Sequence, residues 1–148
     1  MRCAREHRPC QILIVDDNDA DIHLLERSFA RLADPPAVRS VPDGAAALRL
    51  LRCEGEHAGT PLPDLVLLDL NLPGLGGHAV LAELKRDPEL RRLPVIVLTT
   101  SNNPEDIRSC LDHHANAFVR KPFGLAGYRA LADGIAAFWL RTAARAAD

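Results

Sequence analysis

Short apolar runs alternate with longer amphipathic stretches along most of the chain. The strongest runs, QILIV, DLVLLDL and PVIVLTT, are largely unbroken, as in strands that are buried on both faces of a parallel sheet. Two weaker runs, AVRSV and NAFVR, have similar lengths. The five predicted strands are residues 11–15, 37–41, 64–70, 94–100 and 116–120.

Helices are predicted in the stretches between and after these strands. Asp43 and Asn103 are natural N-caps for the second and fourth helices, and Pro104 suits the first position of the fourth. The other three are predicted from apolar residues spaced three or four apart, which form one buried stripe. These residues are Ile22, Leu25, Phe29 and Leu32; Val80, Leu81 and Leu84; and Leu125, Tyr128, Leu131, Ile135 and Phe138.

This alternation predicts an α/β fold, a doubly wound parallel sheet of five strands flanked by five helices. A chain of 148 residues is expected to form one domain. We expect a flexible polar tail at residues 1–10 and a domain over residues 11–143, with no output domain after it. Residues 54–63 are predicted to be a loop because of their Gly and Pro content.

The net charge and the hydropathy of the chain argue against some classes of function. The net charge is −2 and no basic stripe is visible, so nucleic-acid binding is not expected. The longest apolar run near the N-terminus, ILIV, is too short for a secretory signal or a membrane span, so we expect a cytoplasmic protein without membrane contact. Cys3, His7 and Cys10 could offer three zinc ligands, but a structural site needs a fourth, and a loosely ordered tail is the preferred interpretation.

Polar side chains stand at the carboxyl ends of four predicted strands, the edge where open α/β sheets bind ligands. Three clustered carboxylates repel one another unless a divalent cation screens them, and oxygen ligands at an open site suit Mg²⁺. A lysine and a threonine hydroxyl beside them can bind a phosphoryl group, so the set fits phosphoryl transfer to an aspartate. These residues are Asp16, Asp17, Asp69, Thr99, Thr100 and Lys121.

Four blocks of the sequence, VDDND, LLDLNLPGLGG, VIVLTTS and FVRKPF, resemble the signature blocks of the receiver domain of two-component response regulators. The resemblance covers residues 11 to about 143, with the blocks in order and at suitable separations. It implies a flavodoxin-like sheet with strand order 2-1-3-4-5. One departure is Gly76–Gly77, where the family usually has Asp-Gly, and here we expect a looser turn rather than lost chemistry.

The resemblance implies a role for each matching residue. Asp69 would be the phosphoacceptor that attacks a phosphohistidine on a sensor histidine kinase. Mg²⁺ would be ligated by Asp17, Asp69 and the backbone carbonyl of Asn71, with Asp16 helping through water. Such a receiver catalyses only its own Mg²⁺-dependent phosphorylation and dephosphorylation, so we do not expect an enzyme that acts on a separate substrate.

The remaining family positions concern the response to the phosphoryl group. Thr99 matches the switch hydroxyl, and Thr100 falls where the family has a small residue. Lys121 matches the lysine that pairs with the phosphate, and Phe118 stands at the aromatic switch position. The bond between Lys121 and Pro122 would be cis.

A finer resemblance concerns the pathway. The stretches CEGEHAGTPLPD, LTTSNNPEDI and FWL are similar to those of small stand-alone regulators that serve bacterial phytochrome histidine kinases. It implies a bacteriophytochrome as the kinase partner.

Phe138 and Trp139 are adjacent on the last predicted helix. Adjacent helical positions point about 100° apart, so both cannot easily face one core. One aromatic side chain is therefore left for another surface, and we hypothesise a homodimer through this helix, with the fourth helix and fifth strand as a further part of the interface. The neighbouring pair of histidines, His113 and His114, could suggest a metal site or a phosphorelay histidine, but their place at a predicted helix end favours interaction with the helix dipole.

Three rival functions remain. A phosphatase with an aspartate nucleophile usually has a second Asp two residues later, where this chain has Asn71. A nucleotide-binding switch lacks support because neither glycine-rich phosphate-binding motif occurs. A docking module that works without phosphorylation is the third, although the retained Asp69, Asp17, Thr99 and Lys121 speak against it.

Overall fold

The structure is a computed structural model that describes residues 9–140. Most of the expected N-terminal tail lies outside the described residues, and so do Cys3, His7 and the last residues of the expected domain, 141–143.

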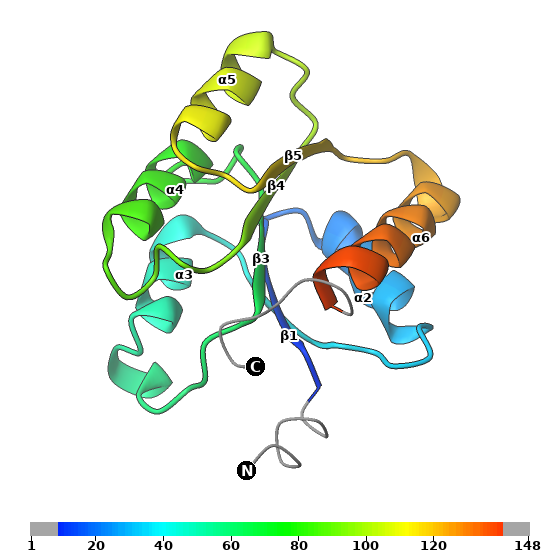
Figure 1. Ribbon diagram of the computed structural model, residues 1–148, viewed down its shortest axis with the longest axis horizontal. Coiled ribbons are helices and arrows are strands. Elements are labelled where there is room, and N and C mark those ends of the chain that lie inside the picture. Colours follow the sequence, from blue (N-terminus) through cyan, green and yellow to red (C-terminus); the bar gives the residue numbers. More distant parts are fainter. Residues whose placement is uncertain (1–8, 141–148) are drawn as a thin grey trace.

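Five parallel strands form one sheet in the order β2-β1-β3-β4-β5, which confirms the predicted topology (Figure 1). In the pairings of β1 with its two neighbours, Val15 at the end of β1 lies opposite Val41 of β2 and Leu68 of β3. The strands therefore end at a common edge of the sheet, and the residues that follow them begin side by side there. The strands are β1 Gln11–Val15, β2 Ala37–Val41, β3 Leu65–Leu68, β4 Val95–Thr99 and β5 Ala117–Arg120.

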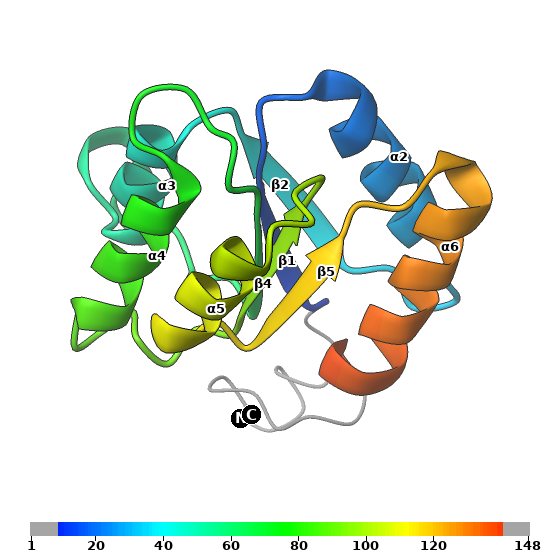
Figure 2. The ribbon, with the colours of Figure 1, turned by 90° about the horizontal axis from the view of Figure 1, so that it is seen from above.

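Helices cover both faces of the sheet, as a doubly wound fold requires. Figure 2 shows α2 and α6 on one face and α3, α4 and α5 on the other. Their bounds are α2 Asp19–Ala30, α3 Gly44–Leu51, α4 Gly77–Arg86, α5 Pro104–Asp112 and α6 Gly124–Ile135.

Each face of the sheet has its own apolar core, because successive strand residues point to opposite sides. Leu13 and Val15 of β1 belong to the core beneath α3, α4 and α5, whereas Ile12 and Ile14 belong to the core beneath α2 and α6. Burial on both sides explains why these strands are continuously apolar.

The predicted helix starts are confirmed at two caps. The Asp43 carboxylate accepts a hydrogen bond from the N–H of Ala46 at 2.7 Å, and the Asn103 side chain accepts one from Glu105 at 3.0 Å. The pair His113 and His114 is at a helix end, as expected: His113 is the C-cap of α5, and His114 has a φ of +67°.

The C-terminal region differs from the single long helix that the apolar spacing predicts. The α-helix ends at Ile135 and continues as a π-helix, η2 Ala136–Leu140. The prediction that Phe138 belongs to the buried stripe is wrong: Phe138 points outward and is 54% exposed, while Trp139 is partly buried against the core under α2 and α6. One aromatic residue thus faces the core and the other does not, as the helix geometry predicts. The predicted loop also contains one turn of 3₁₀-helix, η1 Gly55–His57.

The described part of the chain has no helix that is long and apolar enough to cross a membrane.

Candidate functional site

Asp16 and Asp69 are positioned by backbone hydrogen bonds that extend the sheet one residue beyond its strands. The N–H of Asp16 donates to the Val41 carbonyl at 3.1 Å, and the N–H of Asp69 donates to the Val15 carbonyl at 3.0 Å. Oxygen atoms of Asp16, Asp17 and Asp69 lie within 4.8 Å of one another. Asp16 and Asp69 are only 2% and 5% exposed, whereas Asp17 is exposed, so the acidic cluster opens to solvent on the side of Asp17.

Lys121 brings a positive charge into this cluster from the end of β5. Its backbone N–H donates to the Thr99 carbonyl at 2.8 Å, which extends the pairing of β4 and β5. Its ammonium nitrogen lies 2.8 Å from Asp16 Oδ2 and 3.1 Å from Asp69 Oδ2. The Lys121 side chain is almost fully buried, so these contacts form where water screens them little.

Burial and the charges in this cluster shift the pKa values of Asp16 and Lys121. Burial raises the pKa of the Asp16 carboxyl group, and the ammonium group of Lys121 offsets part of that rise. Burial alone would lower the pKa of Lys121, but hydrogen bonds from its ammonium to Asp16 and Asp21 outweigh burial and raise that pKa above its usual range. Lys121 is therefore charged at neutral pH. The carboxyl groups of Asp16, Asp17, Asp21 and Asp69 outnumber this single ammonium group, so the cluster still favours a further cation.

Asp21 is a fourth acid at this site that the sequence analysis missed. Its Oδ2 lies 2.8 Å from the Lys121 ammonium nitrogen. The only sequence signal was its place in the first turn of α2, whose N-terminus lies at the same edge of the sheet. Asp19 is in the same turn, and acids in the first turn of a helix are common because they interact favourably with the helix dipole. The position of Asp21 in the sequence therefore did not mark it as a site residue.

Thr99 and Thr100 differ in their surroundings. Thr99 is fully buried at the end of β4, and its hydroxyl oxygen accepts a hydrogen bond from the N–H of Ser101 at 3.4 Å. Thr100 is exposed. Of the two hydroxyl groups, the structure places that of Thr99 inside the protein, on the strand next to β3.

The segment after β3 is held close to the Asp69 carboxylate. The backbone N–H of Asn71 donates to Asp69 Oδ1 at 3.3 Å, and the N–H of Gly77 donates to the Leu70 carbonyl at 3.0 Å. A Cβ atom on Gly77 would collide with the backbone of Asp69 and Leu70, so only glycine fits there. Gly76 is the N-cap of α4 and supplies no side-chain hydrogen bond, so the departure from Asp-Gly removes a helix cap.

Phe118 on β5 is half-buried and packs against the core beneath α3, α4 and α5. The predicted cis bond at Pro122 is wrong for this structure, because no peptide bond among residues 9–140 is cis. The trans form is intrinsically favoured before proline by about 0.5–1 kcal/mol. The chain turns into α6 at Gly124 instead, where φ is +69°.

The donor set of the acidic cluster fits a hard divalent cation. Carboxylate oxygens of Asp16, Asp17 and Asp69 converge within the distance that one ion can span. Mg²⁺ prefers oxygen ligands and keeps several of its waters, which the exposed side of Asp17 allows.

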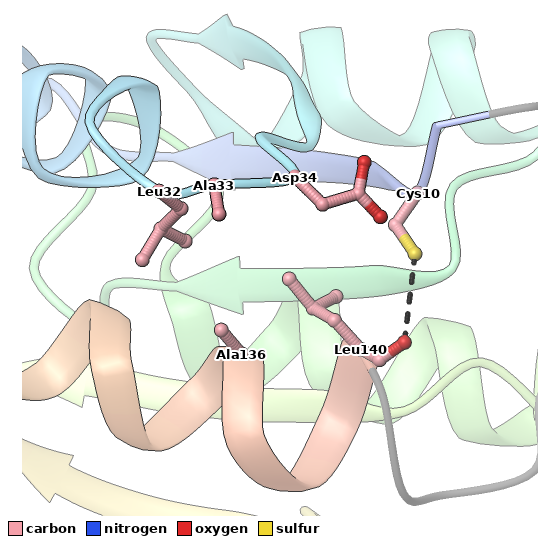
Figure 3. A pocket seen from close by; sticks show the side chains of 6 residues that line it. All are labelled: Cys10, Leu32, Ala33, Asp34, Ala136 and Leu140. Carbon is pink, nitrogen blue, oxygen red and sulfur yellow. Dashed lines mark hydrogen bonds between the residues drawn. The ribbon is translucent and has the colours of Figure 1, made fainter.

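A small cavity of about 110 Å³ lies elsewhere, near the residue that precedes β1 (Figure 3). There the Cys10 thiol donates a weak hydrogen bond to the Leu140 carbonyl, with the sulfur 3.8 Å from the oxygen. Since Cys10 precedes β1 and the acids follow their strands, this cavity is separate from the acidic cluster. Its lining residues are Cys10, Leu32, Ala33, Asp34, Ala136 and Leu140.

Comparisons with known proteins agree on one family. The model of the response regulator receiver domain matches residues 12–132. Response regulator Rcp1 from Synechocystis sp. is 40% identical over 134 residues, which are 90% of this chain and 91% of Rcp1. FilR2 from Methanothrix harundinacea is 41% identical over 132 residues, which are 89% of this chain and 84% of FilR2.

The structure is also similar to that of the phosphorylated cyanobacterial phytochrome response regulator RcpA. The TM-score is 0.89 at 45% identity, over 94% of this chain and 99% of RcpA. The Mn²⁺-bound form of Rcp1 matches with a TM-score of 0.86 at 39% identity, over 93% of this chain and 99% of Rcp1. This protein therefore belongs to the response regulator receiver domain family.

Proposed function

We propose that this protein is a phosphorylation-dependent signalling switch whose phosphoacceptor is Asp69. The observation that carries the proposal is the position of the Asp69 carboxylate, which is buried within 4.8 Å of carboxylate oxygens of Asp16 and Asp17 and 3.1 Å from the ammonium nitrogen of Lys121. A nucleophilic carboxylate needs neighbours that neutralise the charge of an incoming phosphoryl group, and this site has a lysine and a cation-binding set of acids.

In the proposed reaction, a carboxylate oxygen of Asp69 attacks the phosphorus atom of a phosphohistidine on a sensor histidine kinase. The new P–O bond forms as the P–N bond breaks, and the kinase imidazole leaves with the electron pair and takes up a proton. Asp17, Asp69 and the backbone carbonyl of Asn71 would ligate Mg²⁺, with Asp16 acting through water. When bound, Mg²⁺ supplies charge neutralisation at the phosphoryl oxygens.

The response to phosphorylation would start at Thr99, whose hydroxyl would leave the Ser101 N–H and turn toward a phosphoryl oxygen. Ser101 also donates from its hydroxyl to Asp106 at 2.5 Å, and Asp106 lies 3.2 Å from His78 on α4. A shift at Thr99 would therefore reach both α4 and α5. Phe118 would move inward as the Thr99 side chain leaves its place, while exposed Thr100 would accommodate the shift.

The partner would be a sensor histidine kinase of the bacterial phytochrome class. The similarity to RcpA and Rcp1 over nearly their whole lengths supports this assignment. Such a kinase obtains its phosphoryl group from ATP, so this protein would act in the cytoplasm. Transfer from a red-light-sensitive histidine kinase at a higher rate than from an unrelated kinase would test the class of partner.

We also propose a homodimer through the C-terminal helical segment. Phe138 is the outward aromatic residue, and its ring packs edge-on against Trp139 at a centroid separation of 5.1 Å. Phe138 is therefore the residue that we expect to contact the second copy, and Trp139 would support its ring from the inner side. Phe138→Ala should shift a dimer toward monomer in sedimentation velocity, and a wild-type monomer at all concentrations would refute the dimer.

The experiment that tests the central proposal uses acetyl phosphate, MgCl₂ and intact mass spectrometry. Wild-type protein should gain the mass of one phosphoryl group, and Asp69→Asn should gain none. Omission of MgCl₂ should also prevent the gain. Folded wild-type protein that gains no mass with MgCl₂ present would overturn the proposal and favour a docking module that works without phosphorylation.

A further inference from the structure

Lys121 is shared among three carboxylates rather than paired with one. An ammonium group has three hydrogen-bond donors. Its nitrogen lies 2.8 Å from Asp16 Oδ2, 2.8 Å from Asp21 Oδ2 and 3.1 Å from Asp69 Oδ2. Every donor therefore has an acceptor before any phosphoryl group is present, and the contact with Asp69 is the longest.

The start of α2 leaves the Asp21 carboxylate free for this contact. Asn18 is the N-cap, and its side chain accepts a hydrogen bond from the backbone N–H of Asp21 at 3.0 Å. In a capping box, the acid at this third position would reach back to the N–H of the N-cap. Here the N–H of Asn18 donates to Asp16 Oδ1 at 2.9 Å instead. Asp16 thus takes over the reciprocal bond of the cap, and Asp21 faces Lys121.

A second residue lies beside Asp21 on the other side. Tyr128, on α6, is buried, and its hydroxyl group is close enough to Asp21 for the charge of that carboxylate to act on it. Burial raises the pKa of Tyr128 to about 12, and the negative charge of Asp21 adds to the rise, so Tyr128 is a neutral donor at physiological pH. The backbone of Asp21 is held at the start of α2 by the Asn18 cap, so the carboxylate stays near its place when Lys121 moves.

We propose that Asp21 is a positioning residue that competes with the phosphoryl group on Asp69 for Lys121. This inference rests on the proposed phosphorylation of Asp69. Asp16 and Asp69 can share a bound divalent cation, because both belong to the acidic cluster, whereas Asp21 lies outside that cluster. Asp21 is therefore the carboxylate that remains to hold Lys121 once the cation is bound. A phosphoryl group on Asp69 must draw Lys121 away from Asp21 against this attraction. The negative charge of Asp21 also repels the phosphoryl group itself.

Asp21→Asn tests this competition, because asparagine keeps the size and an acceptor oxygen but removes the charge. The probe is beryllium fluoride, a mimic of a carboxylate-bound phosphoryl group, titrated by calorimetry at saturating MgCl₂. Asp21→Asn should bind the probe roughly three to ten times more tightly than wild type, since one competing charge is gone. Mg²⁺ affinity, titrated alone, should not rise. A purely structural role for Asp21 would weaken probe binding rather than strengthen it.

Asp19→Asn is the matched control, because Asp19 is an exposed acid in the same helical turn. It should bind the probe as wild type does. If Asp19→Asn gains as much affinity as Asp21→Asn, or if Asp21→Asn gains none, Asp21 is not a specific competitor for Lys121. Wild-type protein that neither binds the probe nor gains a phosphoryl group from acetyl phosphate would instead overturn the proposed function itself, and this inference with it.

Discussion

The ammonium nitrogen of Lys121 lies 3.1 Å from Oδ2 of Asp69, and both side chains are almost fully buried. The two residues are 52 positions apart in the chain and belong to the ends of β5 and β3, between which β4 lies. Their contact is therefore a product of the parallel sheet, which brings the ends of separate strands to one edge. It gives Asp69 a positively charged neighbour at the place where the proposed phosphoryl group would form.

Lys121→Ala should destabilise the metal-free protein by about 3 kcal/mol, because it leaves the buried carboxylates of Asp16 and Asp69 without their cation. Urea unfolding at neutral pH measures the change. MgCl₂ should restore part of the lost stability, since a divalent cation can take over the neutralising role. A loss that is the same with and without MgCl₂ would contradict the idea that lysine and cation act on the same carboxylates.

Asp17→Ala should abolish stabilisation by Mg²⁺ without unfolding the protein. Asp17 is exposed and belongs to the cation-binding set, but Lys121 does not contact it. Thermal unfolding with increasing MgCl₂ should raise the melting temperature of the wild type and leave that of the variant unchanged. Phosphorylation by acetyl phosphate should be lost in the same variant. A variant that phosphorylates normally would mean that Asp17 belongs only to a strand-to-helix turn.

The raised pKa of Asp16 fixes the direction in which the free energy of unfolding should change with pH. Its pKa is raised above the ordinary value of 3.8, chiefly by burial, so the folded protein binds this proton more tightly than the unfolded chain. The stabilisation that comes from this tighter proton binding at Asp16 is complete below pH 3.8, and it is lost as the pH rises through the raised pKa of the folded state. Asp16→Asn lacks this titration, so the stability of the variant relative to wild type should increase over that window, by at most about 1.4 kcal/mol per pH unit.

Urea unfolding of both proteins at several pH values without metal tests this slope. A difference that is constant with pH would show that Asp16 titrates alike in the folded and unfolded states.

The acidic cluster was predictable because the sheet topology was predictable. Unbroken apolar runs indicated three of the strands, a weaker run indicated the strand before Lys121, and the resemblance to receiver domains implied the strand order. Parallel strands in that order bring Asp16, Asp69 and Lys121 to one edge. Asp21 was not predictable, since Asp19 and Asp21 in one helical turn both have an ordinary explanation in the helix dipole. Only the direction of the side chain separates them, and that depends on the bond between Asn18 and Asp16.

Two other features depend on energies too small for sequence patterns to reveal. The cis and trans forms before Pro122 differ intrinsically by about 0.5–1 kcal/mol, so the fold around the bond decides the isomer. The π-helix at Ala136–Leu140 has a wider turn than an α-helix, and Trp139 rather than Phe138 packs on the core there. The α-helical spacing used to read the sequence does not detect such a short change of turn.

Gly77→Ala should destabilise the protein by about 1–3 kcal/mol, because the added methyl group would strike the backbone of Asp69 and Leu70. The same displacement should lower the rate of phosphorylation at Asp69. Gly76→Ala is the matched control: Gly76 has an extended backbone with a φ of −68°, and its added methyl group would have room. Equal losses in the two variants would point to helix-start conformation rather than to the close contact at Asp69.

Ser28→Ala should leave stability unchanged or raise it by up to about 1 kcal/mol. Ser28 is buried on α2, and among the described residues its hydroxyl oxygen is the buried side-chain polar atom without a hydrogen-bond partner. Alanine removes that unsatisfied group and has the higher helix propensity. Ser28 lies about two turns beyond Asp21 on the same helix and is not one of the residues that contact Lys121, so its substitution should also leave the affinity for beryllium fluoride unchanged. Chemical unfolding and calorimetry measure the two effects, and a loss of more than about 1 kcal/mol would mean that the hydroxyl is hydrogen-bonded in solution.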